Sequence, residues 1–195
     1  MEEPDDMIGD MLGLWNAEAS KIVKQIDWEP TMKIKQTDLG NALFVDHGSI
    51  PANTVFAALM GDIVISPVGS TASLPATNYD VQPDYGCVYN TEYACYIRGT
   101  SKTEAYNGQM CNHSCNHPNA AFVDLGPVVV TKTRGQVTHS LSLPLIGVKA
   151  LERIEEGSEC LVNYGEHCIS EHAREGFIPC RCSSCVAGRG KFIMG

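Results

Sequence analysis

The sequence has few of the features that would direct a protein into a membrane or out of the cell. Within its 195 residues, no apolar run approaches the ~20 residues that a membrane-spanning helix needs. The first residues, MEEPDD, lack the basic region and the apolar run of a signal peptide. We therefore expect a nuclear or cytoplasmic protein that is not secreted and does not bind a membrane.

Basic residues are also scarce, and this limits the possible partners. The chain has 14 lysines and arginines against 23 acidic residues, a formal net charge of −9. No basic stripe is available for a phosphate backbone, so we expect no direct nucleic-acid binding. The acidic balance would suit a basic partner, although the same charge also serves simply to keep a protein soluble. Nothing in the sequence indicates an oligomeric state.

Cysteine, in contrast, is abundant, with nine residues. An odd number of cysteines without a secretion signal argues against a disulfide framework and favours metal binding. The spacing Cys180-x-Cys182-x-x-Cys185 supplies three thiols, one ligand short of a tetrahedral structural zinc site. A fourth ligand must come from elsewhere in the chain. The candidates are Cys111, His113, Cys115, His117, His167, Cys168 and His172.

The stretch CNHSCNHPN, residues 111–119, could form a metal site by itself. Its alternating cysteines and histidines would share one face of an extended strand. A flat row of ligands cannot enclose an ion tetrahedrally, however, and Pro118 follows at once. We therefore favour three ligands from the tail and one remote thiolate.

The order of apolar residues predicts one helix followed by short strands. Residues 5–26 have apolar positions at a helical period, which indicates an amphipathic packing helix that Pro30 ends. After Pro30, short β-like runs alternate with turn residues, and they are too short for strand-helix-strand units. We expect a mainly β domain of several small sheets. Residues 66–78 are expected to form a loop, and residues 170–177 a short helix or turn.

Several motifs resemble those of SET-domain protein lysine methyltransferases. NHSCNHPN, residues 112–119, resembles the NHSCxPN motif of that family. Residues 145–165, LIGVKALERIEEGSECLVNYG, resemble its strand, turn and GEELxxxYG segment, and CRCSSC resembles its post-SET cysteines. Residues 38–65 resemble the start of a SET domain, with its GxGLFA and YxGEVI strands. The resemblance covers roughly residues 38–188, and the motifs together, in this order, are specific to the family.

The resemblance implies a fold and a set of site residues. The fold would be a β-clip SET domain with a pseudoknot over residues 31–169, after a helical extension over 1–30 and before a zinc-binding tail over 170–195. Tyr164 would be the catalytic residue, orienting the substrate amine beside the methyl group. The methyl donor, S-adenosyl-L-methionine, would contact Gly40, Asn41, Ala42, Asn112, His113 and Tyr164. A structural zinc ion would be held by Cys115, Cys180, Cys182 and Cys185.

The chain departs from the family pattern at several of these positions. Ala42 stands where a second glycine is usual, and Leu59 and Asp62 replace the Tyr and Glu of YxGE. Asn112 and His113 are called the NH pair below. The Arg-Phe-Ile that usually precedes this pair is replaced by residues 109–111, Gln-Met-Cys. Val162 stands where an aromatic residue often sets the number of methyl groups added. The motifs therefore leave the substrate and the degree of methylation open.

Three functions are consistent with these motifs. The first is an S-adenosylmethionine-dependent protein-lysine N-methyltransferase, with a histone tail in chromatin as one candidate substrate. The second is a methyltransferase of a non-histone protein or of a small-molecule amine. The third is a SET fold that has lost activity and acts as a binding module, against which the retention of Asn112, His113 and Tyr164 argues.

Overall fold

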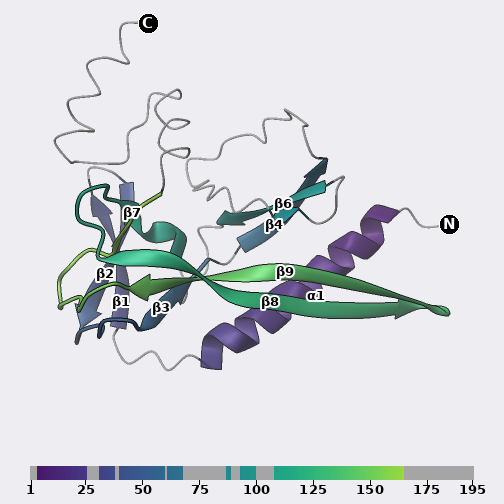
Figure 1. Ribbon diagram of the computed structural model, residues 1–195, viewed down its shortest axis with the longest axis horizontal. Helices are drawn as coiled ribbons and strands as arrows, with labels where there is room; N and C mark the ends of the chain where they lie inside the picture. The colour runs from purple at the N-terminus through teal and green to yellow at the C-terminus, as the bar shows by residue number, and fades with distance from the viewer. Residues whose placement is uncertain are drawn as a thin grey trace, which may run out of the picture. The chain divides into compact units, whose positions relative to one another are not determined.

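The computed structural model describes residues 4–25, 31–37, 40–59, 61–67, 87–88, 93–99 and 108–164 (Figure 1). These ranges are mainly β, with one α-helix at the N-terminal end, which confirms the expected class. The elements are α1 (Pro4–Gln25), β1 (Thr31–Thr37), β2 (Gly40–His47), β3 (Val55–Ala58), β4 (Gly61–Pro67), β5 (Cys87–Val88), β6 (Tyr93–Gly99), the 3₁₀ turn η1 (Gly108–Met110), β7 (Asn112–His113), β8 (Ala120–Arg134), β9 (Val137–Ala150) and β10 (Leu161–Val162).

The strands form four small sheets within the described ranges. Their orders are β1-β2, β10-β7, β3-β9-β8 and β4-β6-β5. The expected loop over 66–78 begins two residues late, because Ser66 and Pro67 belong to β4, and its remainder lies outside the described residues. The predicted turn over 170–177 and the cysteine-rich tail also lie outside them. No described helix is long and apolar enough to cross a membrane.

The chain divides into two compact units. One unit comprises residues 1–27, 58–106 and 124–146, and the other comprises residues 28–57, 107–123 and 147–195. The predicted boundaries at residues 30 and 169 follow family motifs rather than compactness, and they stay a prediction.

Helix α1 is the main feature of the first unit, and its bounds confirm the predicted helix over 5–26 within a residue. Proline suits the first turn of a helix, where its missing N–H is not needed. The buried residues recur every fourth position: Met11, Trp15, Ala19 and Val23. Ile22, which the helical period placed on the buried face, is instead 41% exposed, because Val23 occupies that face.

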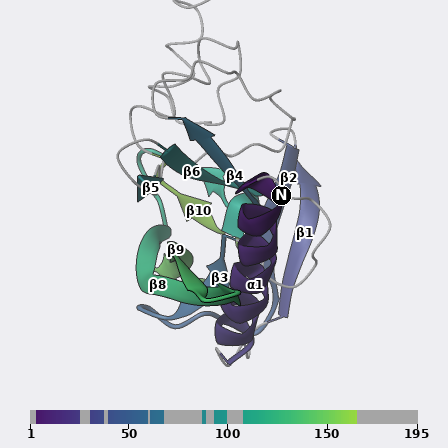
Figure 2. The same cartoon turned by 90° about the vertical axis from the view of Figure 1, so that its right-hand side faces the viewer.

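Helix α1 crosses the β8–β9 hairpin obliquely and lies next to it in both views (Figures 1 and 2). Trp15 is fully buried, and its indole Nε1 donates a hydrogen bond of 3.2 Å to the carbonyl oxygen of Leu143. Lys132 of β8 forms an ion pair with Asp10 of the helix. On the hairpin, burial alternates in the way that strands require, with Val128 and Val130 buried and Val129 exposed. The helix is therefore packed against the hairpin rather than a loose extension.

The second unit has its own apolar core. It is built from residues of β2, β3, η1, β8, β9, β10 and the segments between these elements: Leu43, Val45, Ile50, Phe56, Ala57, Met110, Cys111, Ala120, Val148, Ala150, Ile154, Cys160 and Val162. Backbone hydrogen bonds join the end of β2 to the segment before β10, from Cys160 N to Leu43 O at 2.8 Å and from Val45 N to Ser158 O at 3.1 Å. This pairing connects two parts of the sequence that resemble SET motifs.

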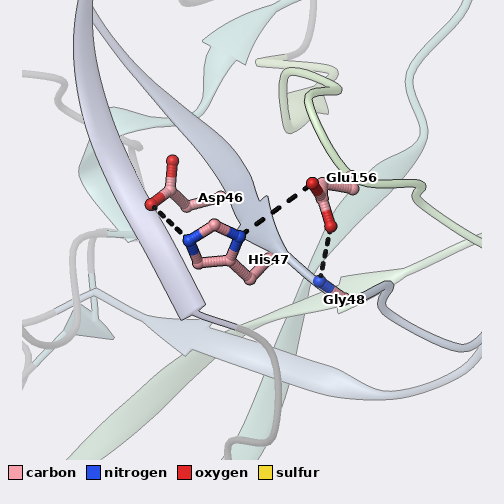
Figure 3. Close-up of polar contacts among 4 residues, drawn as sticks. All are labelled: Asp46, His47, Gly48 and Glu156. Carbon is pink, nitrogen blue, oxygen red and sulfur yellow. Dashed lines mark hydrogen bonds and ion pairs between the residues drawn. The ribbon is translucent and has the colours of Figure 1, made fainter.

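A turn after β2 is fastened by a carboxylate from the same distant segment (Figure 3). Glu156 accepts a hydrogen bond of 3.1 Å from the backbone N–H of Gly48, whose φ of 80° is in the left-handed region that glycine tolerates. The Nε2 atom of His47 lies 3.6 Å from Asp46 Oδ2, and its Nδ1 atom lies 3.9 Å from Glu156 Oε1. The His47 side chain is 74% exposed, so these ion pairs contribute little to stability, and the backbone contact is the structural one.

Candidate active site

Two segments about fifty residues apart in the sequence meet in the second unit. Strand β7, Asn112–His113, pairs in parallel with β10, Leu161–Val162, with Asn112 opposite Leu161 and His113 opposite Val162. Ser114 N extends the ladder with a 2.9 Å hydrogen bond to Val162 O. The NHSC-like and YG-like segments therefore lie side by side.

The side chains of His113 and Tyr164 are in direct contact. The backbone N–H of Tyr164 donates to His113 Nδ1 at 3.0 Å, and the two ring centroids are 5.2 Å apart. Because Nδ1 accepts a hydrogen bond, it carries no proton, and the neutral imidazole has its proton on Nε2. Since His113 is 2% exposed, it holds the backbone of Tyr164 from within the core.

The Tyr164 hydroxyl has a defined hydrogen-bond direction. Its oxygen lies 2.7 Å from the carbonyl oxygen of Cys111, to which it donates its only proton. The hydroxyl oxygen can then act only as an acceptor toward a third group. Tyr164 is only partly buried, so its ring packs against the core while the residue retains access to solvent. An amine N–H is the kind of group that such an oxygen can orient.

Asn112 is held by a residue that the sequence analysis did not select. Asn112 is 8% exposed, and its Nδ2 donates to Glu159 Oε1 at 2.7 Å. Glu159 occupies the position of the second glutamate in the GEEL-like segment. This match to the motif is the sequence feature from which Glu159 could have been selected. The resemblance of that segment to the family motif locates Tyr164 but assigns no role to the Glu159 carboxylate.

Asn119, the last residue of the NHSCxPN-like stretch, was also missed. Its Nδ2 donates to Glu159 O and its Oδ1 accepts from Leu161 N, both at 2.8 Å. Its own carbonyl accepts from Leu151 N at 2.8 Å. One side chain thus satisfies two backbone groups on either side of Cys160, and it fixes the start of β10.

The segment Gly40–Ala42, which resembles the start of the GxGLFA motif, lies in β2. It pairs with β1, where Asn41 faces Gln36 and Ala42 faces Lys35 in the register. Ala42 is fully buried, whereas Asn41 is half-buried. Strand β2 also lies beside η1, the turn that leads into Cys111. The segment is therefore near the NH pair in the fold, and its contact with a methyl donor stays a prediction.

Only one of the four predicted zinc ligands is among the described residues. Cys115 is half-buried, and its Sγ donates to Asn116 Oδ1 at 3.4 Å. Cys180, Cys182 and Cys185 lie outside the described part of the chain. Within that part, no three His, Cys, Asp or Glu side chains are grouped so as to hold a metal. The zinc site with Cys115 stays a prediction.

Two further thiols, of Cys111 and Cys160, are buried beside the site. Burial raises the pKa of Cys160 from its ordinary value of 9.0 to about 12, and the Glu159 carboxylate adds to the shift. Burial likewise raises the pKa of Cys111, with smaller contributions from Cys160 and Glu159. Both thiols are therefore protonated near neutral pH and act as small apolar groups in the core.

This shift predicts a loss of stability at alkaline pH. Above about pH 9 the unfolded thiol loses its proton while folded Cys160 keeps it up to about pH 12. The unfolded state then binds fewer protons, so the free energy of unfolding falls by about 1.4 kcal/mol per pH unit over that window for each such thiol. Urea unfolding at about pH 8 and pH 10 would measure it.

Two matched variants separate the effects. Cys160→Ala removes the thiol, whereas Val162→Ala removes buried volume nearby and leaves the Cys160 thiol in place. Cys160→Ala should lose less stability between the two pH values than the wild type, and Val162→Ala should lose as much as the wild type. Equal losses in all three proteins would show that Cys160 does not carry the effect.

Comparison of the sequence with known proteins shows the family of the chain. The sequence profile of the SET domain family matches residues 20–165, and the chain belongs to that family, whose members are generally methyltransferases. A search of curated proteins finds no significant match. Among solved structures, the chain is weakly similar to a candidate histone methyltransferase of Plasmodium falciparum, with 19% identity and a TM-score of 0.40 over 71% of this chain and 96% of that one.

Proposed function

We propose that the protein is an S-adenosylmethionine-dependent protein-lysine N-methyltransferase. The observation that carries the proposal is the Tyr164 hydroxyl, which donates to Cys111 O and so presents an acceptor beside the NH pair. Membership of the SET family supports the reaction class. The acidic composition supports a basic protein substrate, of which a histone tail is the leading candidate.

The residues present fit a cationic methyl donor. S-adenosylmethionine supplies an electrophilic methyl group on a positively charged sulfonium. Asn112 offers an amide close to the Glu159 carboxylate, and no ion pair between Glu159 and a lysine or arginine is present among the described residues. An amide oxygen that can accept a hydrogen bond and a carboxylate close to it favour a cationic ligand.

Tyr164 would orient the nucleophile. A lysine amine has a reference pKa of ~10.4 and must lose its proton before its lone pair can attack. Apolar surroundings and a nearby positive charge both lower the amine pKa. The Tyr164 oxygen would accept one N–H of the neutral amine and so direct the lone pair at the methyl group. His113 would hold Tyr164 in place through the contact with its backbone N–H.

A binding assay followed by a transfer assay tests the proposal. The wild-type protein should bind S-adenosylmethionine and transfer its labelled methyl to lysine in purified core histones more readily than in a whole-cell lysate depleted of histones. Transfer to the depleted lysate alone would move the proposal to a non-histone protein or a small-molecule amine. Binding without transfer to either pool would favour an inactive SET-fold binding module.

We further propose one structural zinc ion held by Cys115, Cys180, Cys182 and Cys185, with Zn–S distances of ~2.3 Å. The partly exposed Cys115 thiol, three residues after Asn112, supports the proposal because a ligand there would tie the tail to the NH pair. Removal of the zinc should weaken cofactor binding while most of the β core stays folded.

Elemental analysis of the purified protein, with circular dichroism before and after chelation, measures this prediction. We expect about one zinc per chain, and its loss in Cys182→Ser together with most of the cofactor affinity. A zinc-free wild-type protein, or a Cys182→Ser variant with full activity, would contradict the proposal.

A further inference from the structure

The position of Glu159 suggests a role that goes beyond packing. Its Oε1 accepts a 2.7 Å hydrogen bond from Asn112 Nδ2. An ionised carboxylate can only accept hydrogen bonds, so this partner determines which end of the Asn112 amide faces it. The amide nitrogen is turned toward Glu159, and the carbonyl oxygen Oδ1 must occupy the opposite end.

Both partners of this hydrogen bond are held by their backbones. Asn112 lies in β7 and is paired with β10. The Glu159 carbonyl accepts from Asn119 Nδ2, and the next residue, Cys160, donates from its N–H to Leu43 O. Because neither backbone can shift easily, the carboxylate and the amide remain in register. The orientation of the amide is therefore a built feature of the fold.

The negative charge of Glu159 lies close to the Asn112 amide and to two buried thiols. The described residues give Glu159 an amide partner and no lysine or arginine partner. Gln109, a neutral residue, occupies the position that is usually arginine in the resembling motif. The raised pKa values of Cys111 and Cys160 reflect in part the negative potential of this carboxylate. A cationic group on the ligand would be attracted to the same region.

We propose that Glu159 is a positioning residue that fixes the Asn112 amide so that its carbonyl oxygen accepts a hydrogen bond from the α-ammonium group of the methyl donor. The proposal rests on the proposed function, since it concerns how the same site recognises its cosubstrate. Without Glu159 the two ends of the amide become interchangeable, and part of the bound population presents nitrogen to the ammonium group. Glu159 itself need not touch the ligand.

The test compares two ligands that differ by one group. S-adenosylhomocysteine carries the α-ammonium, and its des-amino analogue does not. Glu159→Ala should weaken S-adenosylhomocysteine binding by roughly tenfold to a hundredfold, the range for a hydrogen bond to a charged group. The same variant should bind the des-amino analogue as the wild type does. Glu156→Gln is the matched control, because Glu156 is on the same segment but contacts Gly48, and it should bind both ligands normally.

A reversed hydrogen bond keeps the test decisive if Glu159→Ala does not fold. Asn112→Asp removes the N–H that Glu159 accepts and places two carboxylates face to face, so the affinity for S-adenosylhomocysteine should fall. Adding Glu159→Gln restores a donor between the two side chains while position 112 still presents an oxygen, so the double variant should recover most of the affinity. A role in folding alone would change the affinity for the des-amino analogue as much as that for S-adenosylhomocysteine, so both ligands are measured on these variants.

Three results would overturn the inference. They are an equal loss for both ligands in Glu159→Ala, no loss for either, and no recovery in the double variant. A wild-type protein that binds neither S-adenosylmethionine nor S-adenosylhomocysteine would overturn the proposed function and this inference together. Wild-type binding with unaffected Glu159 variants would overturn this inference alone.

Discussion

Tyr164→Phe should lower the rate of methyl transfer by about 10²–10³-fold, while the affinity for S-adenosylmethionine changes by no more than a few-fold. The substitution keeps the aromatic ring and its contact with His113, and it removes only the hydroxyl that is hydrogen-bonded to Cys111 O. A hydrogen bond that acts mainly in the transition state is worth about this factor in rate. Single-turnover methylation and calorimetric binding measure the two quantities separately.

His113→Ala provides the contrast. It removes the acceptor of the Tyr164 backbone N–H and a buried ring next to Asn112, so it should reduce cofactor binding as well as rate. If Tyr164 is only a packed aromatic residue, Tyr164→Phe should be nearly silent. A wild-type rate in that variant on a confirmed substrate would therefore remove the catalytic assignment.

Trp15→Ala should lower the free energy of unfolding by about 3–5 kcal/mol, the usual range for removing a buried tryptophan. Trp15 is fully buried, and its loss also leaves the carbonyl oxygen of Leu143 without the indole donor. Leu14→Ala, at a neighbouring position that is 42% exposed, is the control and should cost much less. Urea unfolding of both variants at neutral pH provides the comparison.

The result for Trp15 also bears on the extent of the domain. The family match begins at residue 20 and so omits most of α1, Pro4–Gln25. If α1 is part of the folded unit, a chain that begins at residue 20 and keeps its C-terminal end should be markedly less stable than the whole chain. Equal stability of Trp15→Ala and Leu14→Ala would instead show that α1 is a dispensable extension.

The fold class could be predicted because the strongest patterns are local. The helix over 5–26 is visible from its 3.6-residue period, and the short strands from their turn residues. The exposure of Ile22 could not be predicted, because two adjacent apolar residues compete for one face and tertiary packing decides between them. The two-unit division could not be predicted either, since it depends on contacts between distant segments.

The motifs named residues that the fold brings together, and the catalytic and cofactor-binding roles of these residues stay predictions, whereas residues with a structural role were missed. Asn112, His113 and Tyr164 came from the family resemblance, and the fold brings them together on β7 and beside β10. Glu159 and Asn119 were missed because their roles are hydrogen bonds across 40 residues or more of sequence. Single-sequence patterns do not report such pairs. The three cysteines of the tail lie outside the described residues, so their prediction remains to be tested.

The central claim is that this site transfers a methyl group from S-adenosylmethionine to a lysine amine. Incubating the wild-type protein with isotopically labelled S-adenosylmethionine and core histones, followed by mass spectrometry of the products, tests it most directly. We predict labelled methyl on lysine Nζ atoms, with the amount reduced about 10²–10³-fold in Tyr164→Phe. A wild-type protein that binds S-adenosylmethionine but labels no lysine in histones or in a whole-cell lysate, or that labels a different residue type, would contradict the claim.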